Sequence, residues 1–223
     1  MRFNVPMKHL ALALALFATS MAQAASYSST INVSLLAPGG ITTDGVNIDP
    51  TPLSLHQDVS PSGQILPGDG GELGGFMLPL ESITISGTSI LVRVAEGASN
   101  GSTGYLGLGS QHARYVFDNL TVSGQTITGL TFSAFDNFGA SGVPGVSNLP
   151  NLVAGQAIHL SGAHSVVMEL DDIRFRDRGQ GESNNFADFR IDIQTAPVPE
   201  PTTSALALVG LLSLGLARGL RRH

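Results

Sequence analysis

The sequence contains no cysteine and no tryptophan, and its only lysine is Lys8. The lack of cysteine excludes disulfides, thiolate nucleophiles, iron–sulfur clusters and cysteine-based zinc sites. With only three tyrosines and no tryptophan, aromatic platforms for stacking sugar rings are scarce. The composition therefore disfavours glycosidases and lectins that use an aromatic-lined cleft.

Positive charge is also scarce between the two ends of the chain. Residues 25–200 contain six arginines and seventeen acidic residues, which gives this segment a formal charge of −11. Proteins bind the phosphate backbone of nucleic acids with clustered lysine and arginine, so nucleic acid is not expected as a partner. An acidic, lysine-free segment suits a solvated surface or one that meets divalent cations.

Residues 1–24 have the pattern of a cleavable secretory signal peptide. Arg2 and Lys8 come first, and the apolar run 10–18 follows. That run is too short to cross ~30 Å of hydrocarbon, and small residues follow it at the positions that signal peptidase reads. The cleavage-site residues are Ala22, Ala24 and Ala25. The segment predicts export from the cytoplasm.

A second apolar segment lies at the C-terminus. Three prolines in 197–201 stiffen the backbone before the uncharged run 202–217. As a helix this run would be about 24 Å long, somewhat short of a bilayer core. The arginines of the basic tail, 218–223, would stay cytoplasmic and place the acidic body outside. The simplest interpretation is a C-terminal transmembrane anchor.

The order of these C-terminal parts is more specific than a plain anchor. A Val-Pro-Glu-Pro motif, a short Leu/Ala/Gly helix and an arginine cluster resemble the PEP-CTERM sorting signal, over residues 198–223. The resemblance implies that exosortase, a membrane-embedded enzyme of Gram-negative bacteria often encoded beside exopolysaccharide genes, cleaves near the motif. The protein would be held transiently in the inner membrane and then reach the cell surface or the extracellular matrix. The matching residues are Val198, Pro199, Glu200, Pro201, Arg218, Arg221 and Arg222.

The body, residues 25–196, is predicted to be one all-β domain, a β-sandwich or a jelly roll. Gly, Pro and Asn interrupt it every few residues, and short β-type runs lie between them. In the clearest run Phe189, Ile191 and Ile193 alternate with polar residues, as in a half-buried strand. The expected strands are 28–36, 83–86, 89–95, 113–122, 125–135, 156–160, 165–170, 173–176 and 186–193.

Two further patterns concern the connections. Ser-Gly pairs at Gly87, Gly124 and Gly162 lie between apolar flanks and predict tight hairpin turns. The stretch 38–75 is rich in Pro and Gly and predicts a long surface loop or edge region.

Acidic residues gather between positions 169 and 192, around a glycine-containing loop at 177–185. Calcium takes six to eight oxygen ligands, which such acidic residues can supply. Their spacing does not match an EF-hand loop. The same acids alternate with arginines, so cross-strand ion pairs explain them equally well without any cofactor. The structural-calcium hypothesis assigns the ligands Asp171, Asp172 and Asp177.

No convincing catalytic motif is present. Residues 97–101 match G-x-S-x-G, but no helix follows, and we interpret them as a loop. His159 and His164 flank a predicted turn, yet zinc needs a third and usually a fourth ligand. We therefore expect a non-enzymatic surface or matrix protein associated with exopolysaccharide in a biofilm. The alternatives are a calcium-stabilised carbohydrate-binding module and a secreted polysaccharide-active hydrolase.

Overall fold

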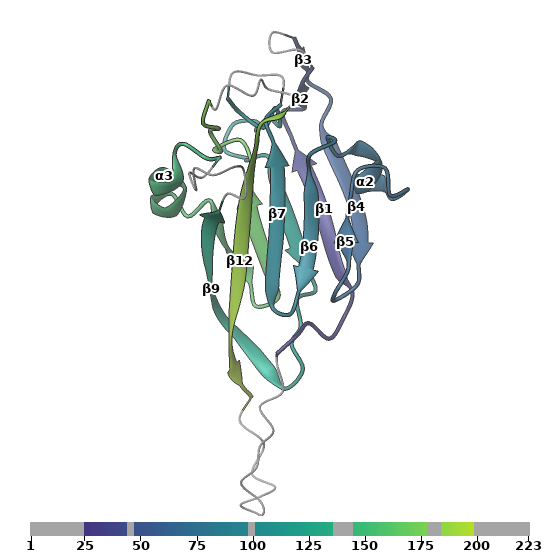
Figure 1. Cartoon of the computed structure of the whole chain (residues 1–223), viewed down its shortest axis with the longest axis vertical. Helices are drawn as coiled ribbons and strands as arrows, with labels where there is room; N and C mark the ends of the chain where they lie inside the picture. Colours follow the sequence, from purple (N-terminus) through teal and green to yellow (C-terminus); the bar gives the residue numbers. More distant parts are fainter. Residues whose placement is uncertain (1–24, 44–46, 98–100, 136–144, 178–183, 199–223) are drawn as a thin grey trace, which may run out of the picture.

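The computed structural model describes residues 25–43, 47–97, 101–135, 145–177 and 184–198. Two five-stranded antiparallel sheets and a small two-stranded sheet contain about half of these residues (Figure 1), and this predominance of strands confirms the all-β prediction. The predicted signal peptide, 1–24, and the sorting tail beyond Val198 lie outside the described residues.

The first large sheet, called the β1 sheet, has β1 next to its edge. Alternate side chains of β1 are fully buried at Ile31, Val33 and Leu35, because one face of the strand lies on the core. The strand order is β10 (Ile158–Gly162), β11 (Ser165–Glu169), β8 (Arg114–Asp118), β1 (Ile31–Ala37) and β4 (Leu53–Val59).

The second large sheet, called the β12 sheet, contains the strand with the clearest sequence pattern. Phe189, Ile191 and Ile193 are buried while Arg190 and Gln194 are exposed, which confirms the predicted alternation. The strand order is β5 (Gln64–Ile65), β6 (Ser82–Ser86), β7 (Ser89–Ala95), β12 (Phe186–Pro197) and β9 (Gln125–Phe135).

The buried faces of both sheets contribute to one hydrophobic core. Leu35, Tyr115 and Phe117 enter it from the β1 sheet, and Ile90 and Phe189 enter it from the β12 sheet. Each fully buried side chain of this size stabilises the fold by roughly 1.5–3 kcal/mol. A single core shared by both sheets makes the described residues one folded body.

Helices are few in the described residues. The helices are α2 (Glu72–Phe76) and α3 (Leu149–Ala154), and the small sheet is β2 (Ile41–Thr42) with β3 (Ile48–Asp49). No helix in the ranges described above is both long and apolar enough to cross a membrane. The predicted transmembrane run, 202–217, lies outside those ranges.

Both ends of the body lie at the same end of the sheets, which we call the tether pole. Near the N-terminal end, the Tyr27 N–H donates to the carbonyl of Gly87 at 3.2 Å. At the other end, the Val198 N–H donates to the carbonyl of Gly124 at 3.0 Å. Tyr27 also bridges to Val122, close to Gly124 in sequence. In Figure 1 the described chain ends at the lower tip of the molecule.

The opposite end of the body, the distal pole, carries the small sheet. Strand β1 runs away from the tether pole, and Leu36 near its far end lies opposite Arg114 of β8. The same end brings Glu169 of β11 opposite Arg114. The turn that follows β11 therefore lies at the distal pole, far from both ends of the body.

The three predicted Ser-Gly turns have different outcomes. Gly87, with φ of 61°, turns the β6–β7 hairpin as predicted. Gly124, with φ of 69°, forms a tight turn, but this turn carries the chain from the β1 sheet to the β12 sheet. The third predicted turn is a tight hairpin between β10 and β11, but Ala163 and His164 form it, and Gly162 is still paired with Ser165 at the end of β10.

Of the two alternatives for 38–75, the edge region is confirmed and the long loop is wrong, because β4 and β5 are edge strands of the two large sheets. This stretch contains β4, which pairs with β1 over seven residues, as well as β5 and α2. Only Val59 of β4 is buried, so the strand exists mainly because it pairs with β1.

The strand predicted at 173–176 is absent. Ile173 and Phe175 are buried between exposed arginines, but only Phe175 makes a bridge, to Val146. A loop packed on the core has produced an alternating pattern without a strand.

Candidate functional site

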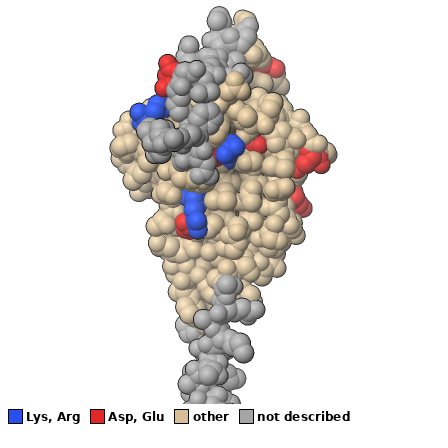
Figure 2. Space-filling view, viewed as in Figure 1, with Lys and Arg blue, Asp and Glu red and all other residues tan. Residues whose placement is uncertain are grey.

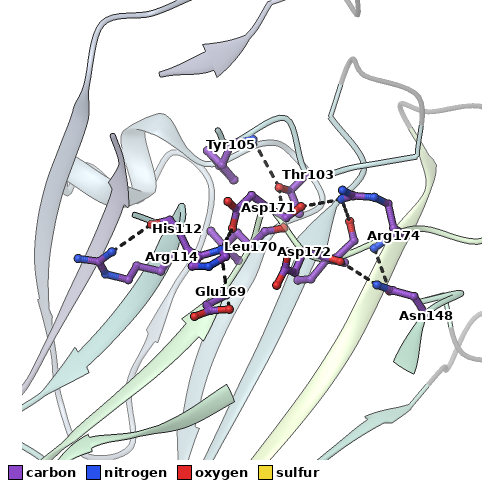
Figure 3. A network of polar contacts seen from close by, with 11 residues as sticks. Thr103, Tyr105, His112, Arg114, Asn148, Glu169, Leu170, Asp171, Asp172 and Arg174 are labelled. Carbon is purple, nitrogen blue, oxygen red and sulfur yellow. Dashed lines mark hydrogen bonds and ion pairs between the residues drawn. The ribbon is translucent and has the colours of Figure 1, made fainter. Parts of the chain in front are cut away.

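The main polar cluster of the described residues lies at the distal pole and is drawn in Figure 3. Asp171 and Asp172 form the turn after β11, and His112 lies two residues before β8. Because β11 pairs with β8, with Glu169 opposite Arg114, the turn is held beside His112. Residues that are 59 positions apart in sequence thus meet in space.

The cluster has the geometry of a potential ligand group. His112 Nδ1 lies 3.2 Å from Asp171 Oδ1 and 3.9 Å from Glu169 Oε2. One ligand atom from each of His112, Asp171 and Asp172 lies within 4.8 Å of the others. The carboxylate of Asp172 is exposed, and that of Asp171 is half-buried. The site is therefore open to ions from solution.

Hydrogen bonds to backbone carbonyls fix the turn that carries the carboxylates. Arg174 donates from Nη1 to the carbonyl of Asp171 at 2.6 Å, and Asn148 donates from Nδ2 to the carbonyl of Asp172 at 2.8 Å. Thr103 donates from Oγ1 to the carbonyl of Leu170 at 3.1 Å. These side chains hold the main chain and leave the carboxylates to face His112.

The acidic surroundings shift the protonation of the cluster. Burial acts to lower the pKa of His112, but the carboxylates of Asp171 and Glu169 outweigh it and raise that pKa above its ordinary value. Burial raises the pKa of Glu169, opposed by His112 and reinforced by Asp172. Crowded carboxylates of this kind are stabilised by an added positive charge, whether a proton or a metal ion.

The donor set decides which metal the cluster suits. Of the three predicted calcium ligands, Asp171 and Asp172 are brought together, whereas Asp177 is not in the group. The third member is His112, an imidazole. Calcium takes six to eight oxygens, while mixed imidazole and carboxylate sets suit zinc and other transition metals. The described cluster fits a transition metal better than calcium.

Other acids of the predicted cluster are held by ion pairs. Asp188 forms a cross-strand pair with Arg93, directly opposite it in the β12 sheet. Asp192 pairs with Arg190, two residues away on the same strand. The cross-strand interpretation therefore holds for Asp188, with Arg93 an unexpected partner from outside the acidic segment, whereas Asp192 is paired within its own strand.

The histidines that flank the β10–β11 turn do not face each other. His159 lies opposite Val167 in the hairpin, and its Nδ1 hydrogen-bonds with the carbonyl of Gln156 at 2.8 Å. His164 lies in the turn, where its Nδ1 hydrogen-bonds with the carbonyl of Leu120 at 2.8 Å. They do not form a ligand pair.

Val198 is the part of the predicted sorting motif that falls within the described residues. Its side chain is 46% exposed just after β12 ends. The other motif and tail residues lie outside those residues: Pro199, Glu200, Pro201, Arg218, Arg221 and Arg222. No protein-family model matches the chain, and no curated protein or solved structure matches it either.

Proposed function

We propose that the chain is a non-enzymatic, exported protein of a Gram-negative bacterium that is processed by an exosortase-like enzyme. Signal peptidase removes 1–24, and the helix 202–217 holds the protein transiently in the inner membrane with its body in the periplasm. Cleavage near 198–201 then releases the body to the cell surface or the extracellular matrix, where it associates with exopolysaccharide.

The observation that carries the proposal is the place of the sorting motif relative to the fold. Strand β12 ends at Pro197, and Val198 is exposed at the tether pole. A membrane-embedded protease needs its recognition segment outside the folded body. The motif 198–201 begins at the first residue beyond β12, which supports its access to such an enzyme.

The arrangement of the two ends supports the same orientation. Tyr27 and Val198 both hydrogen-bond to turns at the tether pole, through Gly87 and Gly124. A body joined to the membrane at this pole directs its distal pole, with the His112 cluster, away from the bilayer. The basic tail 218–223 would remain cytoplasmic by the positive-inside rule.

The finer fold class that we propose for the body is a β-sandwich with jelly-roll-like crossings. Two sheets that share one core support it, as does a chain that crosses repeatedly between them, for example from β4 to β5 and from β8 to β9. A closed core without disulfides suits a released matrix protein, since its stability does not depend on redox conditions.

The processing step is tested by mass spectrometry of the protein recovered from a host that contains an exosortase. The variant Pro199→Ala/Glu200→Ala/Pro201→Ala should keep the tail and stay in the membrane fraction, whereas the wild type should lose its helix and appear in the medium. The matched control, Thr202→Ala/Thr203→Ala, changes neighbouring residues and should be processed normally. An identical C-terminus in the wild type and the triple variant would disprove the proposed processing.

A second candidate function is a metal-stabilised carbohydrate-binding module. The observation that favours it is the convergence of His112, Asp171 and Asp172 at the exposed distal pole. The sequence predicts calcium as the metal of this module. The imidazole in the group makes a transition metal the better match. Titration with zinc and with calcium, followed by the melting temperature, separates the two metals.

A further inference from the structure

The outer face of the β12 sheet is hollowed between four neighbouring strands. The strand registers place Ser82, Arg93, Asp188 and Phe135 in one row across β6, β7, β12 and β9. These four residues, with Thr84 and Leu91 of the next row, line a hollow of about 200 Å³. We call this depression the sheet hollow. Figure 2 views this face, where isolated basic and acidic side chains sit on a mostly uncharged surface.

An ion pair at the base of the sheet hollow is rigidly held. Arg93 donates from Nε to Asp188 Oδ1 at 2.7 Å and from Nη2 to Oδ2 at 3.0 Å. The guanidinium carbon also lies 4.0 Å from the centre of the Phe186 ring. A forked pair with an aromatic neighbour fixes the guanidinium plane before any ligand arrives.

The sheet hollow keeps hydrogen-bonding capacity that the fold does not use. The Arg93 side chain remains 33% exposed, and its Nη1 has no hydrogen-bond partner among the described residues. The hydroxyls of Ser82 and Thr84 likewise have no partner within that part of the chain. Phe135 is half-buried and supplies an apolar wall. Donors, acceptors and one apolar wall thus converge on a small concave surface.

The charge of the sheet hollow selects among ligand classes. Asp188 neutralises Arg93, so the hollow has no net charge with which to attract an anion. The acidic body, with a formal charge of −11 over 25–200, further repels polyanions. A neutral sugar ring offers neighbouring hydroxyls that both donate and accept, together with an apolar C–H face.

We propose that the sheet hollow binds a neutral sugar unit of an extracellular polysaccharide. Ring hydroxyls would accept from Arg93 Nη1 and exchange hydrogen bonds with Ser82 and Thr84, while the C–H face packs on Phe135. This inference rests on the proposed association with exopolysaccharide and names its contact surface. The surface lies on a sheet face, separate from the tether pole and from the His112 cluster.

Affinity electrophoresis of the mature protein, recovered from the medium of the producing cells, tests the inference. The gels contain the producer's exopolysaccharide, dextran as a neutral polymer, alginate as a polyanion, or no polymer. The neutral polymer should retard the wild type, whereas alginate should not. Thr84→Met fills the sheet hollow and removes a hydroxyl, and Phe135→Ala removes the apolar wall. Each should weaken binding about tenfold or more.

A matched control and a stability measurement keep the test sharp. Thr131→Met makes the same change at an exposed position of the same sheet, beyond the lining of the sheet hollow, and should bind like the wild type. Thermal unfolding of each variant reports whether the fold is kept. Phe135→Ala provides a second readout if Thr84→Met unfolds.

The outcomes separate this inference from the proposed function. Wild-type binding that neither hollow variant weakens would overturn the inference and leave export and matrix association in place. Retardation of the wild type by alginate but not by dextran would also overturn it. So would the absence of retardation by any of the polymers. A protein that stays unprocessed in the cell but still binds dextran through Thr84 would support the inference while refuting the proposed route of export.

Discussion

Tyr105 donates its hydroxyl proton to the buried carboxylate of Glu81, with 3.0 Å between the two oxygens. Glu81 is 1% exposed, and its Oε2 also accepts from the Leu78 N–H at 3.0 Å. Its Oε1 and the hydroxyl of Tyr115 have no partner in the described residues. Burial raises the pKa of Glu81 to about 7. The distal pole therefore contains a carboxyl group that the folded state prefers to keep protonated.

This group makes the protein less stable as the pH rises. The folded-state pKa of Glu81 is raised, so its contribution to stability is complete below about 4.5 and is lost as the pH rises through about 7. The loss should reach on the order of 3 kcal/mol by pH 8. Glu81→Gln should remove most of this dependence, because an amide stays neutral.

Urea unfolding between pH 4 and pH 8 measures the effect of Glu81. Glu72→Gln serves as the control, since Glu72 is an exposed glutamate on α2. That variant should keep the wild-type pH dependence. A wild-type protein whose unfolding free energy does not fall from pH 5 to pH 8 would contradict the assignment.

The sequence alone could predict the half-buried strands. It could not predict which strands pair or which distant residues come into contact. The alternation of Phe189 and Ile191 with polar residues predicts β12, because one face of the strand packs on the core. Strand β4 could not be found, since its polar residues gain their strand conformation from pairing with β1. His112 could not be joined to Asp171, because only the β8–β11 pairing brings them together. No local motif in the sequence marks that contact.

The Arg93–Asp188 pair should be strongly coupled in a double-mutant cycle. Arg93→Leu leaves the carboxylate of Asp188, whose side chain is only 6% exposed, without its partner. We expect a loss of about 2–3 kcal/mol, below the value for a fully buried pair because Arg93 is partly exposed. Arg93→Leu/Asp188→Leu should recover part of this loss. Chemical denaturation of the four proteins measures the coupling, and additive effects would contradict it.

Metal titration of the distal pole distinguishes zinc from calcium. We expect zinc to raise the melting temperature and calcium to have little effect, because the cluster includes the imidazole of His112. Asp171→Asn should abolish the zinc shift. Asp177→Asn is the matched control and should keep it, since Asp177 is not in the ligand group. A calcium shift that Asp177→Asn removes would instead restore the ligand set predicted from the sequence.

Two adjacent glycines of α2 should respond to alanine with opposite signs. A Cβ at Gly74 would overlap the carboxylate of Asp69, which is held in place because it accepts from the N–H groups of Leu66 and Gly71. A Cβ at Gly75 would meet open space. Gly74→Ala should therefore destabilise the protein by about 2 kcal/mol or more. Gly75→Ala should stabilise it by about 0.5–1 kcal/mol, because alanine favours the helical state. Urea denaturation at one pH compares the pair, and effects of the same sign would show that the packing of α2 on Asp69 differs from the one described.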